Sequence, residues 1–131
     1  MMNELIKTIS NLPNFYAEKG VPVAQIEQAE KLLGLEFSLD FKMCLREFGA
    51  VSVSGHEFTG FSADKNLNVV EVTQKNRRKN TVEQNLYVIE EAHIDGIVIW
   101  QDASGNIYET TPNSKAKKIA HSLTDYLLKT T

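Results

Sequence analysis

Six acidic side chains lie in a stretch of this chain that contains no lysine and no arginine. The stretch runs from residue 83 to residue 114, and its carboxylates belong to Glu83, Glu90, Glu91, Asp95, Asp102 and Glu109. A surface that gathers charge of one sign steers an oppositely charged partner and raises its association rate. Short hairpins with acidic turns would produce the same pattern without any function. The stretch therefore indicates either a docking surface for a basic protein or ordinary solvated turns.

Carboxylates could also act in pairs, one as a general acid and the other as a base or nucleophile. A glycosidase needs two of them across a cleft, in unlike environments. Glu90 and Glu91 are neighbours, and neighbours on a strand point to opposite faces of the sheet. They cannot form such a pair if the strand extends that far. For these two, and for the pair Asp102 and Glu109, we expect solvated acids with no catalytic role.

The histidines and the single cysteine are too scattered to indicate a metal site. His56, His93 and His121 are not three or four residues apart, and a zinc site needs at least three ligands at suitable spacing. We expect the histidines on loops or at the surface, and we expect no metal. Cys44 shares an apolar helical stripe with Phe41, which predicts a buried and unreactive thiol.

The common catalytic and nucleotide-binding motifs are missing from the sequence. The patterns GxGxxG, GxxxxGKS/T, GxSxG and HExxH do not occur. The basic run from Lys75 to Lys79 could contact phosphates, but it has no interleaved aromatic residues for base stacking. The net charge of -3 also disfavours nucleic acid. We therefore expect no catalysis, no cofactor and no direct nucleic-acid binding.

The overall composition is that of one ordinary globular domain, which we expect to span residues 1–131. The chain is 42% hydrophobic and 24% charged. One cysteine cannot form an intramolecular disulfide, and the first 14 residues lack the pattern of a signal peptide. No stretch approaches the roughly 18 apolar residues of a membrane span. These features predict a cytoplasmic protein without membrane contact.

Helical patterns come first along the chain and strand patterns later, which is typical of an α+β fold. Pro22 suits a first helical turn, Gly34 suits a left-handed cap and Ser38 suits an N-cap. A final helix is indicated by the apolar stripe from Ile119 through Leu123 to Leu127. The expected helices cover residues 2–9, with Met2 at the start of the stripe, 22–34, with Val23 on its stripe, 38–49 and 119–127.

Strands are expected where the apolar period becomes two or where a short run is wholly apolar. The expected strands cover residues 50–61 as a hairpin that turns at Gly55, and then 86–90, 97–101 and 107–109. Residues 68–79 are ambiguous, because Asn68 and Glu71 resemble a helix cap ahead of a polar segment. Trp100 is expected in the core, whereas Tyr108 is better placed for an interface.

Four stretches, taken in order, resemble the SUKH superfamily, which contains bacterial toxin-immunity proteins and fungal cell-wall regulators. They are Ile26–Gly34, Leu39–Gly49, Val69–Arg77 and a strand block made of Leu86–Glu90, Asp95–Asp102 and Gly105–Glu109. The family usually has a proline before its Asp-aromatic-Lys step, where this chain has Ser38 and Leu39. Serine can cap the helix in place of the proline.

The resemblance implies an α+β fold in which N-terminal helices and a C-terminal helix pack against a mostly antiparallel sheet. It also implies a binding role, that of an immunity protein that blocks a secreted toxin, often a nuclease. The family has no shared catalytic residues to carry over, and its toxin-contacting residues vary. The expected contact surface therefore comes from the acidic stretch and consists of Glu90, Glu91, Asp95, Asp102, Tyr108 and Glu109.

Three functions follow from these observations. The first is an immunity protein that binds and neutralises a cognate polymorphic toxin, with a basic nuclease as one candidate. The second is a regulatory or scaffold module that binds a cellular partner without any toxin. The third is a small hydrolase that uses His56 or His93 with a nearby acid, and it predicts that those side chains converge in one pocket.

Overall fold

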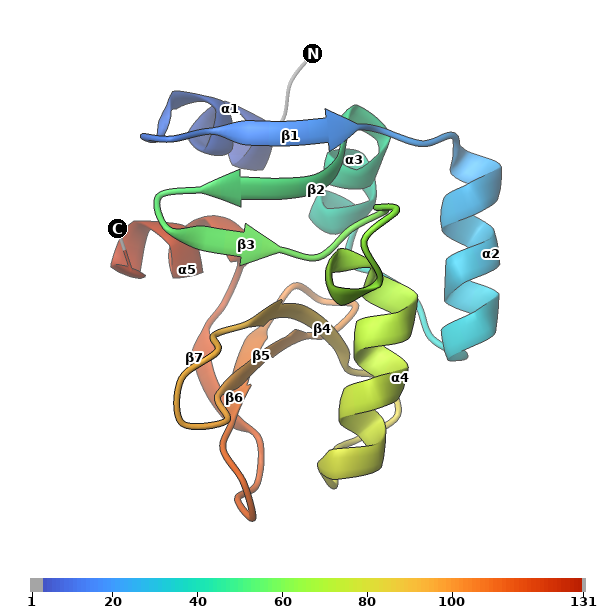
Figure 1. Cartoon of the computed structure of the whole chain (residues 1–131), viewed down its shortest axis with the longest axis vertical. Coiled ribbons are helices and arrows are strands. Elements are labelled where there is room, and N and C mark those ends of the chain that lie inside the picture. The colour runs from blue at the N-terminus through green and yellow to red at the C-terminus, as the bar shows by residue number, and fades with distance from the viewer. Residues whose placement is uncertain (1–3, 131) are drawn as a thin grey trace.

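A seven-stranded antiparallel sheet forms the framework of the protein, whose computed structural model describes residues 4–130 (Figure 1). The strands lie side by side in chain order: β1 (Tyr16–Lys19), β2 (Phe48–Val53), β3 (His56–Phe58), β4 (Tyr87–Glu91), β5 (Val98–Gln101), β6 (Ile107–Thr110) and β7 (Lys117–Ala120). A single residue pair, Phe58 with Glu90, joins β3 to β4. In Figure 1, the half of the sheet made of β1 to β3 runs in a different direction from the half made of β4 to β7.

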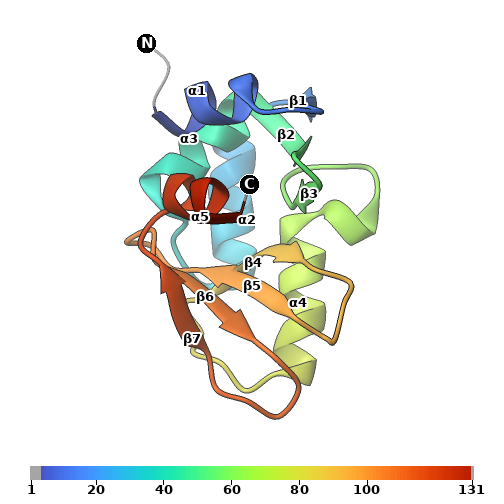
Figure 2. The ribbon, with the colours of Figure 1, turned by 90° about the vertical axis from the view of Figure 1, so that its left-hand side faces the viewer.

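Helices cover both faces of the sheet (Figure 2). They are α1 (Glu4–Asn11), α2 (Val23–Leu33), α3 (Leu39–Glu47), α4 (Val69–Lys79) and α5 (Leu123–Thr130), with a short 3-10 turn η1 (Lys65–Leu67) before α4. This arrangement confirms the α+β fold with helices packed against an antiparallel sheet. The longest helices among residues 4–130, α2 and α4, have 11 residues each, and about 20 are needed to cross a bilayer.

The sheet separates two hydrophobic clusters, because alternate residues of a strand point to opposite faces. The larger cluster joins Tyr87 of β4 to side chains of α1, α2, α3 and α5. The smaller cluster places Val88 and Trp100 against Val72 of α4. Trp100 is fully buried, as predicted, and its Nε1 donates a hydrogen bond to the Thr110 hydroxyl over 2.9 Å.

The predicted caps are present at the helix ends. The Ser38 hydroxyl accepts a hydrogen bond from the Phe41 N–H over 3.1 Å, which begins α3. Gly34 ends α2 in the left-handed conformation with φ of 67°. The Asn68 side chain accepts a hydrogen bond from the Val70 N–H over 3.1 Å. The ambiguous residues 68–79 are therefore an N-cap followed by a helix, α4. Local side-chain chemistry therefore determines where these helices begin and end.

Several predicted boundaries are wrong. The helix expected to reach residue 49 ends at Glu47, because Phe48 already pairs with β1 as the first residue of β2. Ile119, expected in the last helix, lies in β7, and α5 begins only at Leu123, after a hydroxyl cap from Ser122. The strands β1 and β7 were not predicted. Each has four residues, and pairing with a neighbouring strand rather than an apolar pattern defines it.

The N-terminal apolar stripes lie where they were expected, with two exceptions. Leu5 and Ile9 are buried between α1 and the rest of the larger cluster. Met2, the first residue of that predicted stripe, lies outside the described residues. Val23 is 44% exposed, and the buried stripe of α2 begins one turn later at Ile26.

Cys44 lies in the larger cluster, as predicted from its place on the apolar stripe of α3. Burial, with smaller contributions from the charges of Asp40 and Glu47, raises the pKa of its thiol to about 12. A thiol with such a pKa is almost entirely protonated at neutral pH. Because the thiolate is the nucleophile, this cysteine is poorly suited to covalent chemistry.

Candidate functional site

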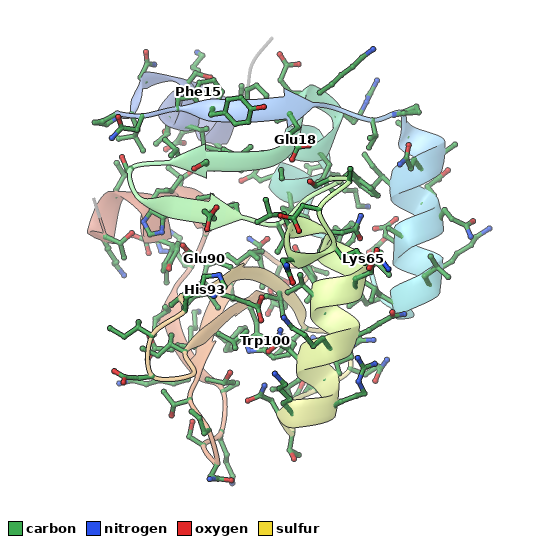
Figure 3. All side chains as sticks on the ribbon, viewed as in Figure 1. Phe15, Glu18, Lys65, Glu90, His93 and Trp100 are labelled. Atoms are coloured by element: carbon green, nitrogen blue, oxygen red, sulfur yellow. The ribbon has the colours of Figure 1, made fainter. Side chains whose placement is uncertain are left out.

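Glu90 was expected to be a solvated acid of the contact surface, but its side chain is only 8% exposed. Figure 3 marks it at the junction of β3 and β4. Its carboxylate accepts a hydrogen bond from the Tyr126 hydroxyl over 2.7 Å and lies 2.9 Å from Nδ1 of His56. His56, expected at the surface, is itself only 12% exposed. Both expectations are wrong, because the pairing of β3 with β4 brings the two side chains together beside α5.

The network continues from His56 to the last turn of α5, where Nε2 lies 2.9 Å from the Thr130 hydroxyl. A carboxylate, an imidazole and a hydroxyl in this order have the connectivity of a catalytic triad. The Thr130 hydroxyl is also 2.8 Å from the carbonyl oxygen of Tyr126, to which it donates. Neither His56 nor Thr130 lines any of the cavities described below. We therefore interpret the network as a structural tie that holds α5 against β3 and β4.

Glu91 points to the opposite face of β4, as predicted for neighbours on a strand. Its carboxylate accepts hydrogen bonds from Lys75 and Asn76 of α4, each over 3.0 Å. Burial favours a higher pKa for Glu91, but the hydrogen bonds from Asn76 and Lys75 outweigh it and leave the pKa lowered. The charge of Glu91 is thus compensated within the protein.

Asp102 organises the turn between β5 and β6 and is only 9% exposed, so the expectation of a solvated acid is wrong here too. One carboxylate oxygen accepts the backbone N–H groups of Ser104 and Asn106, each over 3.0 Å. The other accepts from the Tyr108 hydroxyl over 3.1 Å. Burial, followed by this hydrogen bond to Asp102, raises the pKa of Tyr108. Asp102 therefore shapes the turn and orients the ring of Tyr108.

The predicted contact residues do not share one face of the sheet. The register of β4, β5 and β6 places Glu90 and Glu109 on the face of the larger hydrophobic cluster. Glu91 and Tyr108 lie on the face covered by α4. In addition, Lys117 of β7 lies opposite Glu109. The charge segregation along the chain therefore does not become a single acidic surface.

The turn between β4 and β5 is exposed and holds Asp95 and His93, whose φ values are 52° and 58°. His93 lines the same cavity as Glu91, so one histidine does lie near an acid. None of the side chains that line this cavity carries a hydroxyl or a thiol. Nδ1 of His121, whose side chain is exposed, lies 3.0 Å from a carboxylate oxygen of Asp125. No cluster of His, Cys, Asp and Glu that could hold a metal is found in the described part of the chain.

A groove lies at the C-terminal end of α4. It consists of three cavities of about 470, 350 and 420 Å³ that share walls. Thr81 and Lys115 line the first and second cavities, while Lys79 and Asn80 line the second and third. Figures 1 and 2 both show the end of α4 beside the loop between β6 and β7. We call this feature the α4-end groove.

The cavities of the α4-end groove differ in chemistry. The first has apolar walls of Val82, Leu86 and Ala116 together with the ring of Tyr108. The second is lined by two lysines and by the polar side chains of Asn80, Thr81, Asn113 and Ser114, with no carboxylate. The third holds His93 beside the compensated carboxylate of Glu91. Of the groove residues, sequence reasoning named Tyr108 and Glu91 as partner contacts. It did not bring the others together, because the walls come from segments far apart in the chain.

The family model described as SMI1-KNR4 cell-wall, SUKH_6, matches residues 24–127. The chain belongs to the SUKH superfamily. Comparison with curated proteins gave no match to this chain. The match confirms the resemblance deduced from the four stretches, and it supports a protein-binding role of the toxin-immunity or SMI1-KNR4 type.

The α4-end groove lies entirely within the matched part of this SUKH domain. Its walls run from Asn76 to Ala116, whereas α1 and β1 precede the match. The groove is therefore built on the portion of the chain that defines the family.

Proposed function

We propose that this SUKH domain is an immunity protein that binds and neutralises a cognate polymorphic toxin by protein–protein contact. The observation that carries the proposal is the family match over residues 24–127. In this proposal the domain performs no chemistry itself, acts in the cytoplasm and blocks the toxin by covering its active site or distorting it. A nuclease is one candidate for the toxin, as the family resemblance implies.

The way α4 is held supports a binding role, because a rigid surface loses little conformational entropy when a partner binds. The Thr73 hydroxyl accepts the backbone N–H of Val88 over 2.9 Å. Arg77 donates to the carbonyl oxygens of Leu33 over 2.9 Å and Gln84 over 2.7 Å. These bonds join α4 to β4, to the end of α2 and to the loop that forms one wall of the groove. The groove is thus held in shape before any partner arrives.

Fewer acidic side chains of the predicted contact surface are free than the sequence indicated, and this changes the charge that we expect on the partner. Glu90, Glu91 and Asp102 are engaged inside the domain, which leaves Asp95 and Glu109 from the predicted contact surface, with Tyr108 beside the groove. The argument for a basic toxin depended on all of these carboxylates being free. We therefore propose a toxin partner without assigning it a basic surface, and contact through the predicted residues stays a prediction.

Co-expression tests the proposal directly. The proposal predicts a neighbouring gene that encodes a large secreted protein with a C-terminal toxin domain, and that toxin domain is the partner to test. We expect the SUKH domain to restore growth to cells that express this toxin domain, and to co-purify with it as a stable complex. A folded chain that neither restores growth nor binds the toxin domain would refute the proposal.

A regulatory or scaffold module is the second candidate, and the description SMI1-KNR4 cell-wall of the matched family favours it. This function requires no toxin gene nearby. It predicts that the protein is retained in one stable complex with a cellular partner, and that its loss changes growth in the absence of any toxin. The same groove could serve either function, because both require protein binding.

A further inference from the structure

We infer that the α4-end groove binds an extended, acidic segment of a partner protein. An apolar side chain of the segment occupies the first cavity, and a carboxylate lies between Lys79 and Lys115 in the second. If the partner is the toxin, the inference rests on the function proposed above. The groove would bind in this way whatever the partner's own activity.

The size of the groove suits an extended chain. The three cavities have volumes of about 470, 350 and 420 Å³, within the range of roughly 300–1,000 Å³ that is usual for ligand pockets. Each therefore has room for at least one side chain. Because neighbouring cavities share lining residues, one continuous segment can place successive side chains in all three.

The first cavity has the features of an interface anchor site. Its apolar walls, Val82 and Ala116, pack against the smaller hydrophobic cluster that contains Trp100. The Tyr108 ring forms part of the same cavity, and its hydroxyl is held by Asp102 over 3.1 Å. Tyrosines fixed in this way are frequent hot spots, because they present a large surface at little entropic cost. An apolar or aromatic side chain of the partner fits here.

The second cavity selects negative charge. Lys79 comes from the end of α4, and Lys115 from the loop between β6 and β7. Neither lysine forms an ion pair in the described part of the protein, and no carboxylate lines the cavity. Both lysines are exposed, and a carboxylate bound in the cavity would be attracted by both ammonium groups. This local charge is opposite in sign to the net charge of -3 of the chain.

The flanking cavities argue for a peptide rather than a nucleic acid. Glu83 lines the first cavity and Glu91 lines the third, so carboxylates lie on both sides of the lysine pair, although Lys75 already compensates the charge of Glu91. A nucleic-acid strand carries a charge at every phosphate and would meet these carboxylates. A peptide can place its acidic residue at the lysines and uncharged residues on either side. The alternation of charge along the groove therefore fits a peptide better.

The test uses the whole protein and a capped peptide of sequence Gly-Leu-Ser-Glu-Glu-Ser-Gly as the probe. We expect its addition to shift backbone amide signals of residues 79–83 and 113–116 in nuclear magnetic resonance spectra. The double variant Lys79→Glu and Lys115→Glu should bind about tenfold more weakly, because two attractions at exposed lysines become repulsions. The shifts should also weaken with added salt. Absence of any shift, or shifts confined to other residues, would overturn the inference.

A matched control separates the groove from general charge. The double variant Lys7→Glu and Lys31→Glu makes the same change in net charge on α1 and α2, outside the groove, and should bind the peptide as the wild type does. Should the groove variant unfold, Lys79→Gln with Lys115→Gln provides a milder change, and its fold is checked by Trp100 fluorescence. Equal losses in the groove and control variants would contradict the inference. Binding of a short oligothymidylate, but not of the peptide, would contradict it as well.

A second arm separates this inference from the proposed function. If the toxin domain binds and the Lys79 and Lys115 variants leave its affinity unchanged, the groove is not the docking site and the immunity function stands. If the peptide binds in the groove and no toxin domain is neutralised, the groove inference stands and the immunity function fails. The two results are independent, because only one of them uses the toxin.

Discussion

The carboxylate of Glu90 lies 2.9 Å from Nδ1 of His56, although the two residues are 34 positions apart in the chain. The Tyr126 hydroxyl donates to the same carboxylate over 2.7 Å. One buried carboxylate thus joins β3, β4 and α5. Because β3 and β4 share only a single residue pair, this contact reinforces the junction of the sheet with the fewest paired residues in the described part of the chain.

Removing the carboxylate of Glu90 should destabilise the fold. Glu90→Ala leaves the Tyr126 hydroxyl and the His56 ring without their partner in a buried site. We expect a loss of about 2–4 kcal/mol in the free energy of unfolding. Glu90→Gln keeps an acceptor and should cost less, about 1–2 kcal/mol. Urea denaturation monitored by circular dichroism measures both values.

The control for this prediction is Glu57→Ala, on the exposed face of β3. A surface change of this kind is expected to alter the free energy of unfolding by no more than about 0.5 kcal/mol. Equal effects of Glu90→Ala and Glu57→Ala would show that the buried network contributes nothing to stability.

Alkaline conditions should weaken the fold through Tyr126. Burial, followed by the charge of Glu90, raises the pKa of its phenol above the ordinary value near 10. The unfolded state therefore loses this proton before the folded state does. The contribution of the protonated Tyr126 phenol to the free energy of unfolding is complete below about pH 10 and decreases as the pH rises further. In urea titrations across this range, Tyr126→Phe should show a smaller decrease, while Tyr16→Phe, at an exposed tyrosine, should behave like the wild type.

Asp102→Ala should loosen the turn between β5 and β6. The substitution removes the acceptor of two backbone N–H groups and of the Tyr108 hydroxyl. We expect a destabilisation of about 1–3 kcal/mol and a less ordered Tyr108 ring. Thermal denaturation and the line width of the Tyr108 ring signals report the two effects. Wild-type stability together with an unchanged ring signal would argue against this role.

The acidic contact surface predicted from the sequence needs variants that leave the fold intact. Asp95→Asn keeps a residue type that tolerates the positive φ of 52°, and Glu109→Gln keeps the size of the side chain. If these acids steer a basic toxin, the pair of substitutions lowers the association rate and flattens its dependence on salt. Stopped-flow measurements with the toxin domain give both quantities. An unchanged rate at low salt would remove these residues from the contact surface.

Cys44 should react with thiol reagents only when the protein opens. Its pKa of about 12 leaves roughly one thiolate in ten thousand at pH 8, and the side chain is buried as well. Labelling with dithionitrobenzoate should be slow in buffer and complete within the dead time in strong urea. A cysteine placed at exposed position 57 in a Cys44→Ala background provides the fast reference. Rapid labelling of the native protein would contradict the burial of Cys44.

Helix starts and buried strands were predictable because their signals are local. Ser38 and Asn68 cap helices through hydrogen bonds to residues two or three positions away. The run from Val98 to Trp100 is apolar, and it lies in a strand buried on both faces. By contrast, β7 begins with two exposed lysines and has no apolar pattern of its own. Its strand conformation comes from pairing with β6, which no short window of sequence contains.

The chain by itself determined the fold class, the family and most of the core, since these depend on hydrophobic periodicity and on the order of short sequence stretches. It did not determine which charged side chains are buried or which of them lie close together. Glu90 and Asp102 looked free in the sequence and are buried, because their partners are brought to them by strand pairing and by a turn. Lys79 and Lys115 looked unrelated and line one cavity, because α4 ends beside the loop between β6 and β7. Electrostatic energy depends on distance in space, and only the tertiary structure supplies those distances.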